Sequence, residues 1–347
     1  MKRIAFFLTF LALLTAYSNA QVNLQPAATV NLTRSEVITV GQLRTEVEGM
    51  EKSAGRTFTQ AERVQVLDLM INQRLVLQAA ERDRIAVTDN EINQQIQQLR
   101  SSMAQQIGRQ PTDAEFAQAV MSESGLDVPA FRDQLRRQMI VQKYLVSKKG
   151  DLLNSVRAPT ETEITTQYNN ARTDFVRPDT IRFSMIQVVY GPDAASRNRA
   201  RDLANQLYRE IGSNPSKFDE LVLRAQAPNS GYQAGDAGYM PRNSQAVSVV
   251  GQEFLDIAFN LRQGEISRLI EGRQGFQIIK VTENHAMKSL QLDDIYQPGS
   301  NITVRQYIFN VMVNQRQQSV LAQASQELTS ELRAGRTFQV FENNIRW

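Results

Sequence analysis

The sequence predicts an α+β protein with more than one domain, in which helices dominate both ends of the chain and a small mixed unit lies between them. Three observations predict this class. Capping-box motifs open a series of amphipathic segments before residue 158, alternating β-branched residues appear after residue 180, and helical periodicity returns from residue 304. At ~150 residues per domain, 347 residues are enough for two or three units.

Residues 1–20 have the pattern of an export signal. Lys2 and Arg3 precede an uncharged apolar stretch, and small residues close the segment. The apolar stretch is shorter than the ~20 residues that a membrane-spanning helix needs. We therefore expect an exported, soluble protein without a lipid anchor, since no cysteine is present to carry one. The alternative is that the signal stays uncleaved as a membrane anchor.

The residue counts exclude several classes of chemistry. With no cysteine and only His285, the chain cannot form a disulfide, a thiolate nucleophile or the multi-ligand sites of most zinc enzymes. It contains no Gly-x-x-x-x-Gly-Lys-[Ser/Thr] loop for nucleotide phosphates. The balance of 39 Lys and Arg against 36 Asp and Glu is too even for a broad nucleic-acid-binding face. We expect no cofactor, no metal and no nucleic-acid partner.

Helical signals fill most of residues 21–158. The polar start, Gln21–Arg34, has no periodicity and predicts a flexible lead-in, whereas the β-branched run Val37–Val40 predicts a short strand. Four helices are expected to begin at Thr-x-x-Glu capping boxes, in which the hydroxyl and the carboxylate satisfy free amides of the first turn. These boxes are Thr59/Glu62, Thr88/Glu91, Thr112/Glu115 and Thr160/Glu163.

The pattern within these helices predicts how each is placed. The helix that follows Thr59 is apolar nearly all round, which is typical of a central buried helix. A long helix over Asp127–Leu153 carries six basic residues, and we interpret them as a solvated face rather than a phosphate or lipid site. The helix from Thr160 lies in a linker, residues 159–178, and should end at Arg177-Pro178 because proline disfavours helix before it.

The middle unit, residues 179–285, changes to mixed periodicity. We expect strands and helices in this order: strand Ile181–Tyr190, helices Asp193–Ile211, Lys217–Ala225 and Gln252–Leu261, and strands Ile266–Ile270 and Phe276–Val281. In the tail, residues 286–347, helical periodicity predicts a helix over Val304–Arg333, and a β-like pattern predicts a final strand near Thr337–Phe341.

Four ordered sequence blocks in the middle unit resemble a parvulin-type prolyl isomerase domain. They are GDAGY from residue 235, EFLDIAFNL from residue 253, GEIS from residue 264 and GFQIIKV from residue 275. The resemblance implies a βαααβαββ domain that holds a proline ring in an apolar pocket. The whole layout is similar to the SurA and PrsA foldases. That similarity implies that residues 21–158 form a helical chaperone region, and that the tail returns to complete it.

The sequence departs from the parvulin pattern where the pocket should be. Parvulins have a histidine in the first strand and a second one in the last strand; Met185 and Gln277 occupy those positions here. Phe254 keeps the aromatic character of the pocket floor, and Met240 is a further pocket position. His285 lies beyond the expected last strand and matches no motif position. A sulfur atom and an amide cannot copy a pair of hydrogen-bonded imidazoles.

These observations lead to one functional hypothesis and two alternatives. We expect a periplasmic, ATP-independent chaperone or foldase that binds unfolded or extended exported chains, including outer-membrane proteins during assembly. Its parvulin domain should have weak or no isomerase activity, because site geometry is easily lost. The first alternative is an active peptidyl-prolyl isomerase whose pocket tolerates the changes. The second is an envelope scaffold protein that reuses the fold.

Overall fold

A computed structural model describes residues 23–212 and 214–347, so the expected export signal lies outside the described residues. The described chain forms two compact units. One combines the residues up to Arg157 with Gln315–Trp347, and the other spans Ala158–Asn314. Helices and strands are present in both, which confirms the predicted α+β multidomain class. Among the described residues, no helix is both long enough and apolar enough to cross a membrane.

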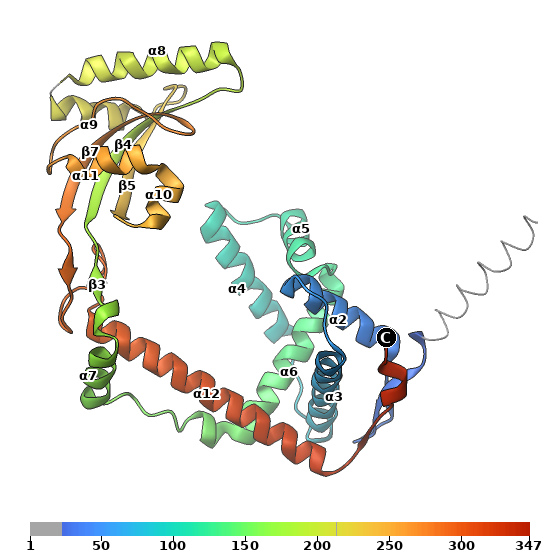
Figure 1. Cartoon of the computed structure of the whole chain (residues 1–347). Coiled ribbons are helices and arrows are strands. Elements are labelled where there is room, and N and C mark those ends of the chain that lie inside the picture. The colour runs from blue at the N-terminus through green and yellow to red at the C-terminus, as the bar shows by residue number, and fades with distance from the viewer. Residues whose placement is uncertain (1–22, 213) are drawn as a thin grey trace, which may run out of the picture. The chain divides into compact units, whose positions relative to one another are not determined.

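Among the described residues, the N-terminal part of the first unit contains the helices α2 (Val40–Ala54), α3 (Gln60–Arg82), α4 (Asp89–Ile107), α5 (Asp113–Ser124) and α6 (Val128–Leu153) (Figure 1). The predicted capping boxes at Thr59, Thr88 and Thr112 begin α3, α4 and α5, with both reciprocal bonds formed in each. A fourth box, Thr39 with Gln42, begins α2. Local sequence therefore sets where these helices start.

The segment expected to be a flexible lead-in contains a strand instead, so that prediction was wrong. Strand β1 (Pro26–Val30) pairs with β2 (Glu36–Thr39) on one side and with β9 (Phe338–Val340) on the other. Ala27, Ala28 and Val30 are fully buried. The strand exists because the nearby β2 and the distant β9 satisfy its backbone groups, and the sequence pattern of residues 26–30 does not indicate such pairing.

Residues Gln315–Trp347 belong to this first unit. Helix α12 (Val304–Ala334) buries Ala324 and Leu328 in one cluster with residues of α3 and with Tyr144 and Leu145 of α6. Lys149 of α6 donates to two α12 carboxylates, 3.1 Å from Glu327 and 2.7 Å from Glu331. Strand β9 and the short helix η2 (Glu342–Ile345) then lie against β1.

The second unit begins with a helix that is shorter than expected. Helix α7 (Glu161–Asn170) starts at the predicted Thr160 box but ends at Asn170 rather than at Arg177. The turn η1 (Arg172–Asp174) and the strand β3 (Val176–Arg177) follow, and β3 pairs with β8 (Lys288–Ser289). The buried Phe175 ring stacks on Tyr168 at 5.6 Å and so turns the chain out of the helix.

The main sheet of this unit has the order β5-β4-β7-β6 and is antiparallel throughout. Its elements, in chain order, are β4 (Thr180–Val189), α8 (Ala194–Ile211), α9 (Pro215–Arg224), β5 (Gln233–Pro241), α10 (Ser244–Val250), α11 (Gln252–Asn260), β6 (Ile270–Glu271) and β7 (Gly275–His285). The expected order βαααβαββ differs in one place, because only two helices precede β5 and α10 follows it. Asn243 caps α10, a signal that the sequence analysis did not use.

The two faces of this sheet support separate apolar clusters. On one face, Ile186, Val188 and Ile278 pack with α8 and α9. On the other, Ile181, Phe183 and Ile279 pack with α10 and α11. The division follows from the alternation of side chains along a strand. The sequence blocks that resembled parvulins contribute to both faces.

Candidate functional site

The four pocket positions predicted from sequence lie on the α10–α11 side of the sheet. Met185 of β4, Met240 of β5 and Phe254 of α11 belong to one apolar cluster. Gln277 of β7 points to the same face, because it stands two residues before Ile279 in that cluster. Met185 is register-paired with Ile279, so Met185 and Gln277 are diagonal neighbours, about 7–8 Å apart.

Only two of these four side chains reach the surface. Phe254 is 2% exposed and its ring centroid lies 5.8 Å from that of Phe183, while Met240 is 8% exposed. Met185 and Gln277 are half-buried. The aromatic floor is therefore present but lies beneath the surface, and a ligand approaching this face would first contact a thioether and an amide.

The strand next to Met185 leaves room for such a ligand. Gly235 of β5 stands opposite Met185, and a Cβ added to it would have no heavy atom within 4 Å. Gln277 stands opposite Gln187, so the polar groups at this end of the face are amides. Neither a thioether nor a carboxamide gains or loses a charge by ionising near neutral pH. These positions therefore offer apolar contact and hydrogen bonds rather than acid–base chemistry.

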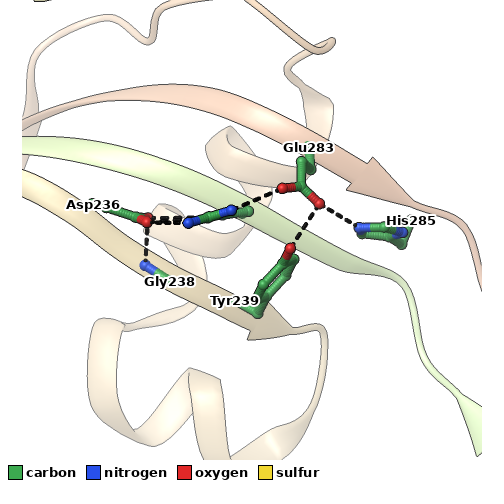
Figure 2. Close-up of polar contacts among 6 residues, drawn as sticks. Asp236, Gly238, Tyr239, Glu283 and His285 are labelled. Carbon is green, nitrogen blue, oxygen red and sulfur yellow. Dashed lines mark hydrogen bonds and ion pairs between the residues drawn. The ribbon is translucent and has the colours of Figure 1, made fainter. Parts of the chain in front are cut away.

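A polar network at one end of the sheet was missed by the sequence analysis (Figure 2). Arg182 of β4 lies directly opposite Tyr239 of β5 and Glu283 of β7. Its Nη1 donates to Glu283 Oε1 at 3.0 Å, and its Nε donates to Asp236 Oδ2 at 3.1 Å. The Tyr239 hydroxyl donates to Glu283 Oε2 at 2.8 Å. The network therefore links three strands side by side.

The single histidine also joins this network. Strand β7 continues to His285, so placing this residue beyond the last strand was wrong; Nε2 of His285 lies 3.0 Å from Glu283 Oε2. Hydrogen bonds from Tyr239, His285 and Arg182 lower the pKa of Glu283 to about 2, with the Tyr239 bond the largest cause. The hydrogen bond to Asp236 and the one to Glu283 raise the pKa of Arg182 further above its usual value.

This network holds strands together rather than offering a reactive group. Each carboxylate is matched by a guanidinium, a phenol or a backbone amide, and Gly238 N donates to Asp236 Oδ1 at 2.9 Å. Within the part of the chain that the structure describes, no cluster of three or more His, Asp or Glu side chains is suited to a metal ion. Sequence blocks did contain Asp236 and Tyr239, but only the strand register places them beside Glu283.

The first unit presents apolar side chains to solvent. Leu69, Met121 and Val146 lie on α3, α5 and α6, and each is at least half exposed. By contrast, Met70 and Met139 pack against apolar clusters of the same unit. Several basic residues of α6 have acidic partners: Arg136 contacts Asp89 and Asp133, Lys143 contacts Glu91, and Lys148 contacts Asp83.

Two family models match separate parts of the chain. Residues 181–283 match the PPIC-type peptidyl-prolyl isomerase domain, and residues 3–145 match the SurA-like N-terminal domain. The first range covers the sheet that carries Met185 and Gln277. The second covers helices α2 to α5 and most of α6.

The curated relatives that match this chain include SurA chaperones and parvulin-type isomerases. A "Chaperone SurA" from Chromohalobacter salexigens is 25% identical over 229 residues, 66% of this chain and 49% of that relative. A "Probable parvulin-type peptidyl-prolyl cis-trans isomerase" from Bordetella bronchiseptica is 21% identical over 226 residues, 59% of this chain and 85% of that relative. The chain spans about half the length of the SurA relatives that it matches.

A solved structure of a SurA-like chaperone from Campylobacter jejuni can be overlaid on 88% of this chain and 96% of its own. The TM-score of this overlay is 0.38 and the sequence identity is 13%.

Proposed function

We propose that this chain, a SurA-like foldase homologue with a parvulin-type domain, is an ATP-independent chaperone for unfolded exported proteins in the periplasm. One observation carries the proposal. The unit that matches the SurA-like N-terminal domain is built from both ends of the chain and leaves Leu69, Met121 and Val146 exposed on its helices. Exposed apolar side chains can hold an unfolded chain reversibly and so keep it from aggregating.

Suppression of aggregation tests this proposal. A urea-unfolded β-barrel protein is diluted into buffer with and without the purified protein, and light scattering is followed over time. We expect the protein to lower scattering without ATP, and a Leu69→Gln/Met121→Gln/Val146→Gln variant to lower it less. Leu223→Gln is the matched control, because Leu223 is exposed to a similar degree on α9 of the other unit.

The outcomes separate the proposal from an envelope scaffold. If the unmodified protein neither binds nor protects an unfolded chain, the chaperone assignment fails and a scaffold role gains support. If the Leu223→Gln control loses as much protection as the triple variant, the client-binding surface does not lie on the first unit.

We also propose that the parvulin-type domain has little or no isomerase activity. Catalysis must lower a rotation barrier of ~18–20 kcal/mol by stabilising the twisted amide. The face that holds Phe254 offers a thioether at Met185 and an amide at Gln277, and neither can form the imidazole pair of parvulins.

An active isomerase is the second candidate, and the buried Phe254 beside Met185 favours it, since this apolar face could still hold a proline ring. A protease-coupled assay on a proline-containing tetrapeptide decides between the two. Turnover close to that of an authentic parvulin would establish the second candidate, and turnover at the uncatalysed rate supports the first.

A further inference from the structure

The first unit contains a concave site on its surface. Its volume is about 530 Å³, within the ~300–1,000 Å³ range of ligand-binding pockets. The C-terminal end of α3, the chain that follows it, the segment before β2 and one turn of α6 line the site. All of these elements belong to the same compact unit.

Positive charge exceeds negative charge in this site. Its charged lining consists of four arginines and two glutamates: Arg34, Arg74, Arg84, Arg137, Glu36 and Glu81. Arg34 forms ion pairs with both glutamates, and Arg74 lies 3.6 Å from Glu36. Arg34 and Arg74 therefore pair with the two glutamates of the site, and the guanidiniums of the other two arginines have no acidic partner in it.

Arg84 and Arg137 are the two remaining cations. Both are exposed, and neither side chain has a hydrogen-bond, ion-pair or ring partner among the described residues. Other cations of the same helices do have partners: Arg136 contacts Asp89, and Lys143 contacts Glu91. Two unpaired guanidiniums in one concavity are arranged to receive an anion, because arginine binds carboxylates through its planar fork of donors.

The rest of the lining is apolar. Leu77, Ile85 and Ile140 contribute half-buried side chains to the same site. Ile85 directly follows Arg84, and Ile140 stands one helical turn after Arg137, so it lies on the same face of α6. Arg137 and Ile140 therefore lie on one face of α6, and Arg84 and Ile85 line the same concavity.

We propose that this site binds the C-terminal residue of an unfolded polypeptide, with its main-chain carboxylate on Arg84 and Arg137 and its apolar side chain on the floor. A terminal residue carries both groups on one Cα, which matches a cation beside an apolar surface. In an extended internal segment, an acidic residue and its apolar neighbour point to opposite sides. The inference rests on the proposed chaperone function, since it names the part of the client that this unit recognises.

Fluorescence anisotropy with labelled peptides tests the inference on the full-length protein. One ten-residue peptide ends in leucine with a free carboxylate, a second has the same sequence with a C-terminal amide, and a third is amidated and carries an internal aspartate before leucine. We expect the free acid to bind about fivefold more tightly than either amide, the gain expected for a partly exposed charge pair. The preference should decrease as salt is added.

Substitutions test whether the preference for the free-acid peptide arises at Arg84 and Arg137. Arg84→Gln/Arg137→Gln should abolish the difference between acid and amide, whereas Arg346→Gln should preserve it, because Arg346 is an exposed residue of the same unit that lies outside the site. Neither free arginine has a partner to lose, so circular dichroism and the unfolding midpoint should be unchanged in the double variant.

Three results would overturn the inference: equal binding of acid and amide, equal binding of the internal-aspartate peptide and the free acid, or full preference in the double variant. Its failure can be distinguished from failure of the proposed function. A protein that suppresses aggregation but does not prefer the free acid remains a chaperone without this site. A protein that prefers the free acid but protects no client retains the site and loses the function.

Discussion

Leu328 provides a direct test of whether the C-terminal helix is a structural part of the first unit. This side chain is 4% exposed and lies in one cluster with Val76, Tyr144 and Leu145, which belong to α3 and α6. Leu328→Ala removes three carbon atoms from this cluster. At about 0.8 kcal/mol for each, the lost burial is about 2.4 kcal/mol.

The cavity adds to this loss. Because ion pairs join α12 to both α6 and α3, the three helices cannot close fully around the missing atoms, and total costs of ~3–5 kcal/mol are typical of such sites. Leu321→Ala is the matched control, since it lies on the same helix but is half exposed. It should cost less than about 1 kcal/mol.

Urea unfolding followed by tryptophan fluorescence measures the difference. Trp347 is the chain's single tryptophan and lies in the first unit, with the Arg44 guanidinium 4.9 Å from its ring centroid. We expect Leu328→Ala to lower the urea midpoint by about 1 M or more and Leu321→Ala to leave it nearly unchanged. Equal shifts in the two variants would refute the reasoning, because they would mean that α12 is not buried at Leu328.

Three further outcomes follow from the second unit. Met185→His/Gln277→His should raise isomerase turnover at least about tenfold, since the two positions are diagonal neighbours and a hydrogen-bonded imidazole pair there needs to stabilise the twisted amide by only about 1.4 kcal/mol to do so. Gly299→Ala should lower the urea midpoint of this unit, because Gly299 has φ +78° and a Cβ there would lie 2.4 Å from Tyr239 Cε2. Tyr239→Phe should raise the pKa of Glu283. The lowered pKa stabilises the folded protein above pH 4.5 and is lost as the pH falls toward 2, so the variant should lose less stability on acidification.

Each of these outcomes has its own control. The single variants Met185→His and Gln277→His should gain little turnover, and an equal gain in either one would show that no pair is needed. Gly264 has φ +87° with no heavy atom near the added Cβ, so Gly264→Ala separates backbone strain from the clash with Tyr239. Urea midpoints from pH 6 to pH 2 for Tyr239→Phe and for Tyr208→Phe complete the set, and parallel curves would contradict the role of Tyr239.

Helix starts could be predicted well because their signals are local. A threonine and a glutamate three residues apart satisfy the amides of one turn, so Thr59, Thr88, Thr112 and Thr160 begin helices where the motif places them. Helix ends were less predictable. The helix from Thr160 stops at Asn170 because Phe175 is buried against Tyr168, a contact that depends on packing rather than on a terminal motif.

The site illustrates the same division. The sequence segments that resemble parvulins indicated Met185, Met240, Phe254 and Gln277. Alternation along the strands places Met185 and Gln277 on one face of the sheet, and Met240 and Phe254 of α11 belong to the same apolar cluster as Met185. The sequence segments could not show that Phe254 and Met240 are covered while Met185 and Gln277 reach the surface. Burial depends on how α10 and α11 lie on the sheet, and α10 itself was not predicted.

The sequence by itself determined the fold class, the capped helices and the replacement of both parvulin histidines, since each depends on residues close together in the chain. Tertiary structure alone decided that β1 is a strand, because its partners lie at Glu36–Thr39 and Phe338–Val340. It also brought Arg182, Tyr239 and Glu283 side by side, and it placed Arg84 and Arg137 in one concavity. Except for the pairing of β1 with the nearby β2, these arrangements join residues tens to hundreds of positions apart, and tertiary folding creates them.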